Sequence, residues 1–215
     1  MKKTSRNAVP RWPAIAAVLA VGLLWFALPE SLTPGPSWLL IVLSVALIIP
    51  SEITKRRGNV KANRMLGFAV DGVVTIAMVG SLWMLVSALP AHKETPIELL
   101  RSAVVLWFSN ILVFASWYWR LDAGGPNARD LRDVHTDGAF LFPQMIILHK
   151  DGTTGADGWR PGFVDYLFLA FNTSTAFSPT DVPVLTHWAK LLMMIQATIS
   201  FATVILLAAR AVNIL

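Results

Sequence analysis

Long apolar stretches, separated by short polar and charged segments, occupy most of this chain. Four stretches hold at most one charged residue each: 12–49, 65–89, 102–119 and 191–209. The charged residues are Glu30 in the first stretch and Asp71 in the second, and the other two stretches hold none. About 20 apolar residues in a helix match the roughly 30 Å hydrocarbon core of a bilayer. The pattern therefore predicts an all-α fold, a polytopic transmembrane helix bundle.

We expect one membrane domain over residues 1–215, with six spans. Their predicted positions are about 12–28, 38–51, 65–89, 97–119, 163–179 and 188–210. The alternative is five spans plus a re-entrant helix, because a polar stretch follows the apolar start of the fifth segment. Charge does not choose between the two arrangements.

Composition supports a membrane protein and excludes several site chemistries. Hydrophobic residues make up 55% and charged residues 14% of the chain, against about 25% charged residues in soluble domains. The chain has no cysteine, which excludes disulfides, thiolate metal sites and cysteine nucleophiles. The net charge of +5 does not predict nucleic-acid binding, because the basic residues lie at the ends of spans, where membrane topology places them.

The basic residues also predict an orientation. They concentrate in the N-terminal segment, in the loop after the second span and in the long loop 120–161. The opposite side is expected to hold only Lys93, Arg101 and Lys190. Because cytoplasmic loops collect Lys and Arg, we expect the N-terminus and the long loop in the cytoplasm. That loop could also dock a cytoplasmic partner.

Polar residues inside the spans are the first candidates for function. A charge such as that of Asp71 costs about 2.5–3.5 kcal/mol at the centre of an inserted helix. It is therefore expected to face the bundle interior, water or a cation, either as an ion or proton relay or as part of a structural pair. For Asn110, and for Gln196 in the last span, hydrogen bonding between helices is the favoured interpretation.

The segment 172–181 is the most informative polar stretch, with one amide, five hydroxyls and a carboxylate. Its Pro179 breaks a helix, and non-helical backbone at membrane depth must face protein or a water-filled cavity. The candidate residues of an ion pathway, or of a polar bundle interior, are Asp71, Asn110, Asp165, Asn172, Thr173, Thr175, Ser178, Thr180 and Asp181.

This segment resembles the pore loop of the potassium-channel superfamily, in which a short helix, a hydroxyl-rich turn and an acidic residue precede a long helix. The glycines of that filter are replaced by Ser178 and Thr180. The chain more closely resembles a family of uncharacterised bacterial integral membrane proteins, classed as a domain of unknown function. The similar segments are 119–126, 140–144, 163–167, 175–181 and 208–213. This resemblance implies the bacterial inner membrane and no particular activity.

Three classes of function remain open. The leading hypothesis is an ion-channel-like protein, or one that transports ions or small solutes, as a homo-oligomer in the lipid bilayer. The alternative is a membrane scaffold that binds a partner without transport. The least favoured is a membrane enzyme with Asp71 or Asp165 as a base, because the chain has no catalytic motif and its four histidines lack metal-ligand spacing. We therefore expect no enzyme activity, no cofactor and no metal.

Overall fold

The computed structural model describes residues 9–88, 95–132, 135, 138–147, 159–175 and 182–214, and within these ranges the fold is an all-α bundle. The helices are α1 (Trp12–Leu24), α2 (Leu39–Arg56), α3 (Val60–Ala88), α4 (Pro96–Leu121), α5 (Pro126–Asp130), α6 (Phe163–Thr175) and α7 (His187–Ile214). Short 3-10 turns occupy Trp25–Ala27, Glu30–Leu32, Asp122–Gly124 and Pro143–Met145. The predicted fold class is confirmed.

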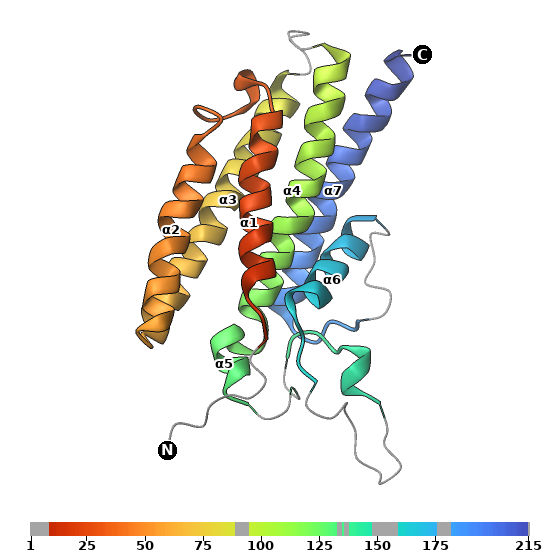
Figure 1. Cartoon of the computed structure of the whole chain (residues 1–215). Coiled ribbons are helices and arrows are strands. Elements are labelled where there is room, and N and C mark those ends of the chain that lie inside the picture. The colour runs from red at the N-terminus through yellow and green to blue at the C-terminus, as the bar shows by residue number, and fades with distance from the viewer. Residues whose placement is uncertain are drawn as a thin grey trace.

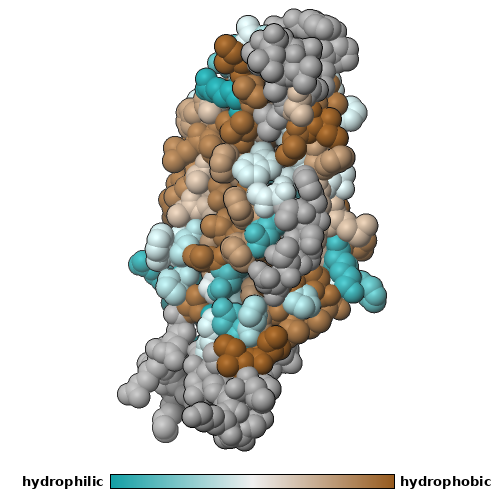
Figure 2. Space-filling view, turned by 90° about the vertical axis from the view of Figure 1, so that its right-hand side faces the viewer, coloured by the Kyte–Doolittle hydropathy of each residue, from teal (hydrophilic) through white to brown (hydrophobic). Residues whose placement is uncertain are grey.

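Three helices are long and apolar enough to cross a membrane, and this supports the membrane character predicted from the sequence. They are Val60–Ala88, Pro96–Gly124 and His187–Leu206. The helical stretch Trp12–Ala27 is apolar but shorter. Figure 2 shows apolar side chains over much of one face of the molecule, with hydrophilic side chains gathered toward the end that carries α5.

Helix α4 lies at the centre of the bundle and contacts α1, α3, α6 and α7 (Figure 1). A capping box defines its start. The Thr95 hydroxyl accepts a hydrogen bond from the Glu98 N–H, and the Glu98 carboxylate accepts one from the Thr95 N–H at 2.9 Å. These bonds satisfy donors that the first turn of a helix leaves free. At the other end the chain turns sharply through Gly125, whose φ of 90° favours glycine.

Helices α6 and α7 run in the same direction, although they follow each other in the chain. The amide of Gln196 donates to the Ala170 carbonyl at 2.7 Å, and one turn further along both helices Ser200 donates to the Ser174 carbonyl at 2.7 Å. Two consecutive membrane-crossing helices would run in opposite directions. Helix α6 therefore enters the bundle and the chain returns to the same end before α7 begins.

Backbone pairing fixes where the returning chain lies. The Leu141 N–H donates to the Pro183 carbonyl at 2.9 Å, and the Leu185 N–H donates to the Ala139 carbonyl at 2.8 Å. Residues 182–185 therefore lie against 139–141, at the end of the bundle that carries α5. Figure 1 shows α6 reaching only part of the way along the bundle while α7 runs its full length.

The parallel course of α6 and α7 favours the re-entrant alternative over six through-going spans. Helix α6 ends at Thr175 after 13 residues, which gives it a length of about 20 Å at 1.5 Å per residue. The last turn of α6 contacts α7 inside the bundle, where Ser200 donates a hydrogen bond to the Ser174 carbonyl. The first turn of α7, which contains Lys190, lies at the basic end of the bundle.

The direction of α7 predicts the position of the C-terminus relative to the N-terminus. The start of α1 and the start of α7 lie at one end of the bundle, and α7 runs to the other (Figure 1). We expect a reporter fused after Leu215 to be periplasmic and one fused before Met1 to be cytoplasmic. Paired alkaline phosphatase and green fluorescent protein fusions measure this. Both reporters on the same side would contradict a re-entrant α6.

Candidate functional site

Asp71 has the cationic partner that its position in an apolar helix requires. Its carboxylate has no exposed surface. It accepts one hydrogen bond from Arg120 Nε at 2.6 Å and another from the Ser116 hydroxyl at 2.8 Å. Breaking such a buried pair leaves an uncompensated charge. Of the two interpretations of Asp71, this geometry favours the structural ion pair.

The guanidinium of Arg120 reaches Asp71 across the backbone of α3. A methyl group at Gly67 would lie 1.8 Å from Arg120 Nη1, so a side chain at that position would displace the arginine. Beside Arg120, a cavity of about 50 Å³ lies among α1, α2, α3 and α4. We call it the base cavity. Its polar lining consists of Arg11, Ser51, Glu52, Asn63 and Arg120. A volume of this size can hold a few water molecules.

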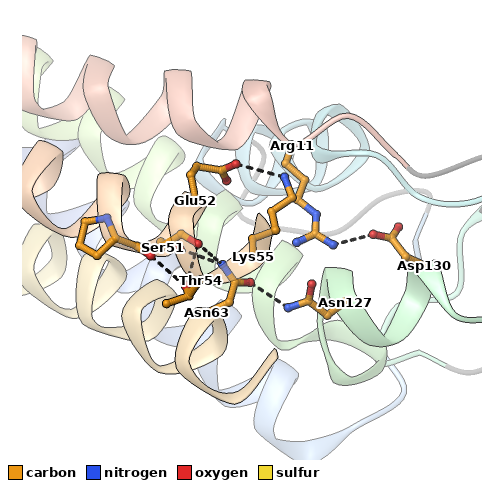
Figure 3. Close-up of polar contacts among 9 residues, drawn as sticks. Arg11, Ser51, Glu52, Thr54, Lys55, Asn63, Asn127 and Asp130 are labelled. Carbon is orange, nitrogen blue, oxygen red and sulfur yellow. Dashed lines mark hydrogen bonds and ion pairs between the residues drawn. The ribbon is translucent and has the colours of Figure 1, made fainter. Parts of the chain in front are cut away.

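Polar contacts join the helix ends around the base cavity (Figure 3). The Arg11 guanidinium donates a hydrogen bond to the Asp130 carboxylate of α5, with 2.5 Å between Nη2 and Oδ2. The Asn63 amide donates to the Ser51 carbonyl at 2.8 Å, and its oxygen accepts from Asn127 at 2.9 Å. These bonds attach α5 to α1 and α3, and α2 to α3. They hold the lining of the cavity in place.

A second polar site surrounds the last turn of α6, and we call it the α6-end cluster. Its members are Trp107, Asn110 and Tyr118 of α4, Ala170 and Ser174 of α6, and Gln196 and Ser200 of α7. The last four carbonyl groups of a helix have no partner within it. Ser200 of α7 donates to one of these, the Ser174 carbonyl, and Gln196 adds a hydrogen bond to the Ala170 carbonyl one turn earlier in α6.

The amide oxygen of Asn110 is the open acceptor of this cluster. The Asn110 side chain is fully buried. Its nitrogen lies 3.3 Å from the Gln196 carbonyl oxygen and 3.4 Å from the Ser174 hydroxyl. Its Oδ1 atom has no hydrogen-bond partner in the described part of the chain. Leaving a buried acceptor unpaired costs about 1–3 kcal/mol, so this atom marks a position where a donor or a cation would be stabilised.

Gln196 holds the cluster together by bonding in three directions. Its amide nitrogen donates to the Ala170 carbonyl and, at 2.8 Å, to the Ser174 hydroxyl. Its oxygen accepts a hydrogen bond from the Tyr118 hydroxyl. Trp107 closes the other side by donating to the Ser200 hydroxyl at 3.0 Å. The interhelical hydrogen bonding predicted for Asn110 and Gln196 is therefore present.

Asp122 anchors the segments at the basic end, a role that the sequence did not reveal. Its carboxylate is fully buried. It accepts hydrogen bonds from the Ala139 N–H at 2.5 Å and from the Tyr166 hydroxyl at 2.6 Å. The Arg129 guanidinium donates to the Asp122 carbonyl at 2.8 Å and lies 5.2 Å from the Tyr166 ring centre. This group fixes the start of α6 to the end of α4.

Four other predicted site residues, Asp165, Asn172, Thr173 and Thr175, lie along α6. Asp165 accepts a hydrogen bond from the Gly162 N–H at 2.7 Å. Thr173 donates to the Leu169 carbonyl, and Thr175 donates to the Phe171 carbonyl. The side chain of Asn172 is half-buried. These hydroxyls bond to their own helix.

Three candidates, Ser178, Thr180 and Asp181, lie outside the described residues. Within the described residues, no group of three or more His, Asp or Glu side chains could hold a metal ion. The two polar sites are separate, because α4 presents Ser116 and Arg120 to α3 but Asn110 to α6 and α7.

Two signals could have located the missed residues. Arg120 follows the uncharged run 102–119. Because α3 and α4 are antiparallel neighbours, the end of α4 lies beside the first half of α3. Long arginine side chains near helix ends also reach along apolar surface. Asp122, by contrast, was one of several acidic residues in a long loop, and no local pattern distinguished it.

Comparison of the chain with protein-family models, curated proteins and solved structures finds no match.

The Asp71–Arg120 pair predicts a specific pattern of stability changes. Arg120→Met leaves the Asp71 carboxylate buried without its cation, and we expect a loss of about 3–5 kcal/mol in the free energy of unfolding. The double variant with Asp71→Leu should recover much of this loss, since no charge is then buried. Unfolding of the purified protein in detergent measures both. The control is Arg101→Met, at an exposed arginine of α4, and an equal effect there would contradict the prediction.

Proposed function

We propose that this chain is a multi-pass protein of the bacterial inner membrane that moves a cation or a small cationic solute. The helices α1, α2, α3, α4 and α7 cross the bilayer, and α6 enters from the cytoplasmic side and ends within it. The cation is held at the α6-end cluster. The observation that carries the proposal is a half-helix that ends beside Asn110, a buried side chain whose Oδ1 atom has no hydrogen-bond partner among the described residues.

The electrostatics at the end of α6 favour a positive ligand. The C-terminal end of a helix carries a partial negative charge of about half a unit. In secondary transporters, such half-helix ends and their carbonyl groups coordinate sodium ions or protons near the bilayer centre. Asn110 and the Ser174 hydroxyl supply further oxygen atoms here, and the described residues of the cluster carry no cationic side chain. An anion would find no charged partner among these groups.

The proposal includes a homo-oligomer. Helix α7 contributes to the cluster with one face only, and its remaining surface exposes large apolar side chains. They include Leu191, Met194, Ile195, Phe201 and Ile205. Lipid or a second copy can cover this face. Copies packed along α7 would enclose the cluster more fully than one chain does.

Asn110→Ala tests the transport site. In proteoliposomes with an imposed gradient of Na⁺, K⁺ or protons, we expect uptake by the wild-type protein above that of empty vesicles. Removing the amide should lower uptake about tenfold, since a hydrogen bond to a charged group contributes about 1.5–3 kcal/mol. The matched control is Ser109→Ala, because that hydroxyl bonds only to the Val105 carbonyl of its own helix among the described residues.

Melting temperature in detergent separates loss of fold from loss of function in these variants. Uptake lost in Asn110→Ala with a melting temperature near that of the wild type supports the proposal. Wild-type vesicles that take up none of the three cations would refute transport of these ions. Equal uptake by both variants would remove Asn110 from the pathway.

A partner-binding scaffold is the second candidate, and one observation favours it. The segments at the basic end expose the apolar side chains of Ile146, Ile147 and Leu185. An exposed apolar patch beyond the crossing helices is typical of a docking surface. A stoichiometric partner that copurifies with the wild type and is lost from the double variant Ile146→Ser, Ile147→Ser would support this function. A wild-type chain that purifies alone would argue against it.

A further inference from the structure

A second cavity lies at the basic end of the bundle, on the other side of Arg120 from the base cavity. Its volume is about 170 Å³, and we call it the α5 cavity. The start of α3, the end of α4 and α5 form its walls. The charged residues in its lining are Arg64 and Arg120, with no carboxylate among them. Its polar neighbours Asn63 and Asn127 bond to each other at 2.9 Å (Figure 3).

Both guanidinium groups retain hydrogen-bond donors for a ligand. Arginine carries five N–H donors, and Arg120 uses its Nε–H for Asp71. Arg64 is exposed, stacks on the Phe68 ring at 5.5 Å and forms no ion pair with any described residue. Two arginines that face one cavity match the geometry of a phosphate group, which accepts paired N–H bonds from the planar guanidinium.

The rim of the cavity is apolar rather than polar. Leu131 and Val60 line it and are 86% and 51% exposed. A free phosphate ion would make no use of these side chains, whereas the glycerol and upper acyl chains of a lipid would cover them. Two further exposed basic residues, Arg57 after the end of α2 and Lys61 in the first turn of α3, add to the positive potential at this end.

We propose that the α5 cavity binds the phosphate of an anionic phospholipid of the cytoplasmic leaflet, with Arg64 and Arg120 as its ligands. The lipid phosphate contacts the outer edge of the Arg120 guanidinium while Asp71 holds the inner edge. A bound lipid therefore stabilises the arrangement in which Arg120 spans α3 and α4. This inference rests on the membrane placement in the proposed function, but it does not depend on cation transport.

The test compares lipids added to the full-length protein in detergent. The probes are phosphatidylglycerol, phosphatidylcholine and inorganic phosphate, and the readouts are the melting temperature and the number of lipids retained in native mass spectrometry. We expect phosphatidylglycerol to raise the melting temperature more than phosphatidylcholine does. Arg64→Gln should weaken the apparent affinity for phosphatidylglycerol about fivefold, which corresponds to about 1 kcal/mol for one basic residue.

Arg57→Gln is the matched control, because it removes one exposed positive charge from the connection between α2 and α3 without altering the lining of the cavity. Affinity kept in this control and lost in Arg64→Gln supports the site. An equal loss in both variants would reduce the effect to general surface charge and overturn the proposal. A shift by inorganic phosphate as large as that by phosphatidylglycerol would overturn the lipid as ligand. Neither readout involves ion flux, so this inference and the transport proposal can fail separately.

Discussion

The rest of the bundle depends on one constraint, which is that the backbone groups at the end of α6 must find partners inside an apolar interior. A helix that ends within a bilayer cannot leave its last carbonyl groups to water, and each unsatisfied group would cost several kcal/mol. Ser200 meets this need at the Ser174 carbonyl, and Gln196 adds a hydrogen bond to the Ala170 carbonyl one turn earlier. These contacts require α7 to lie parallel to α6 and in a fixed register.

The parallel arrangement in turn determines the path of the chain at the basic end. To begin α7 beside the start of α6, the chain must return through a segment that pairs with residues 139–141. The carboxylate of Asp122 holds residues 139–141 in place, because it accepts hydrogen bonds from the Ala139 N–H and the Tyr166 hydroxyl. A buried carboxylate with several donors is costly to remove but specifies one arrangement of its neighbours.

The same rule applies to charge on the other side of α4. Asp71 is tolerated in a long apolar helix because Arg120 and Ser116 reach it, and Gly67 leaves room for the guanidinium. This pair lies next to the base cavity and the α5 cavity, both of which Arg120 lines, whereas the α6-end cluster lies among α4, α6 and α7. The transport proposal therefore rests on the α6-end cluster and not on the ion pair. Arg120 belongs both to the ion pair and to the lining of the proposed lipid site.

The sequence by itself determined the all-α class, the long apolar helices and the presence of polar groups such as Asp71 and Asn110 within them, because hydrophobic length and charge are local properties of the chain. Even the helix starts follow local rules, as the Thr95 capping box illustrates. Only the tertiary structure decided that α6 runs parallel to α7, that Arg120 is the partner of Asp71, and that Asp122 joins Ala139 to Tyr166. These outcomes depend on contacts between residues that are distant in sequence, 45 to 49 positions apart for Asp71 with Ser116 and Arg120, and no local pattern encodes which distant donor meets which acceptor.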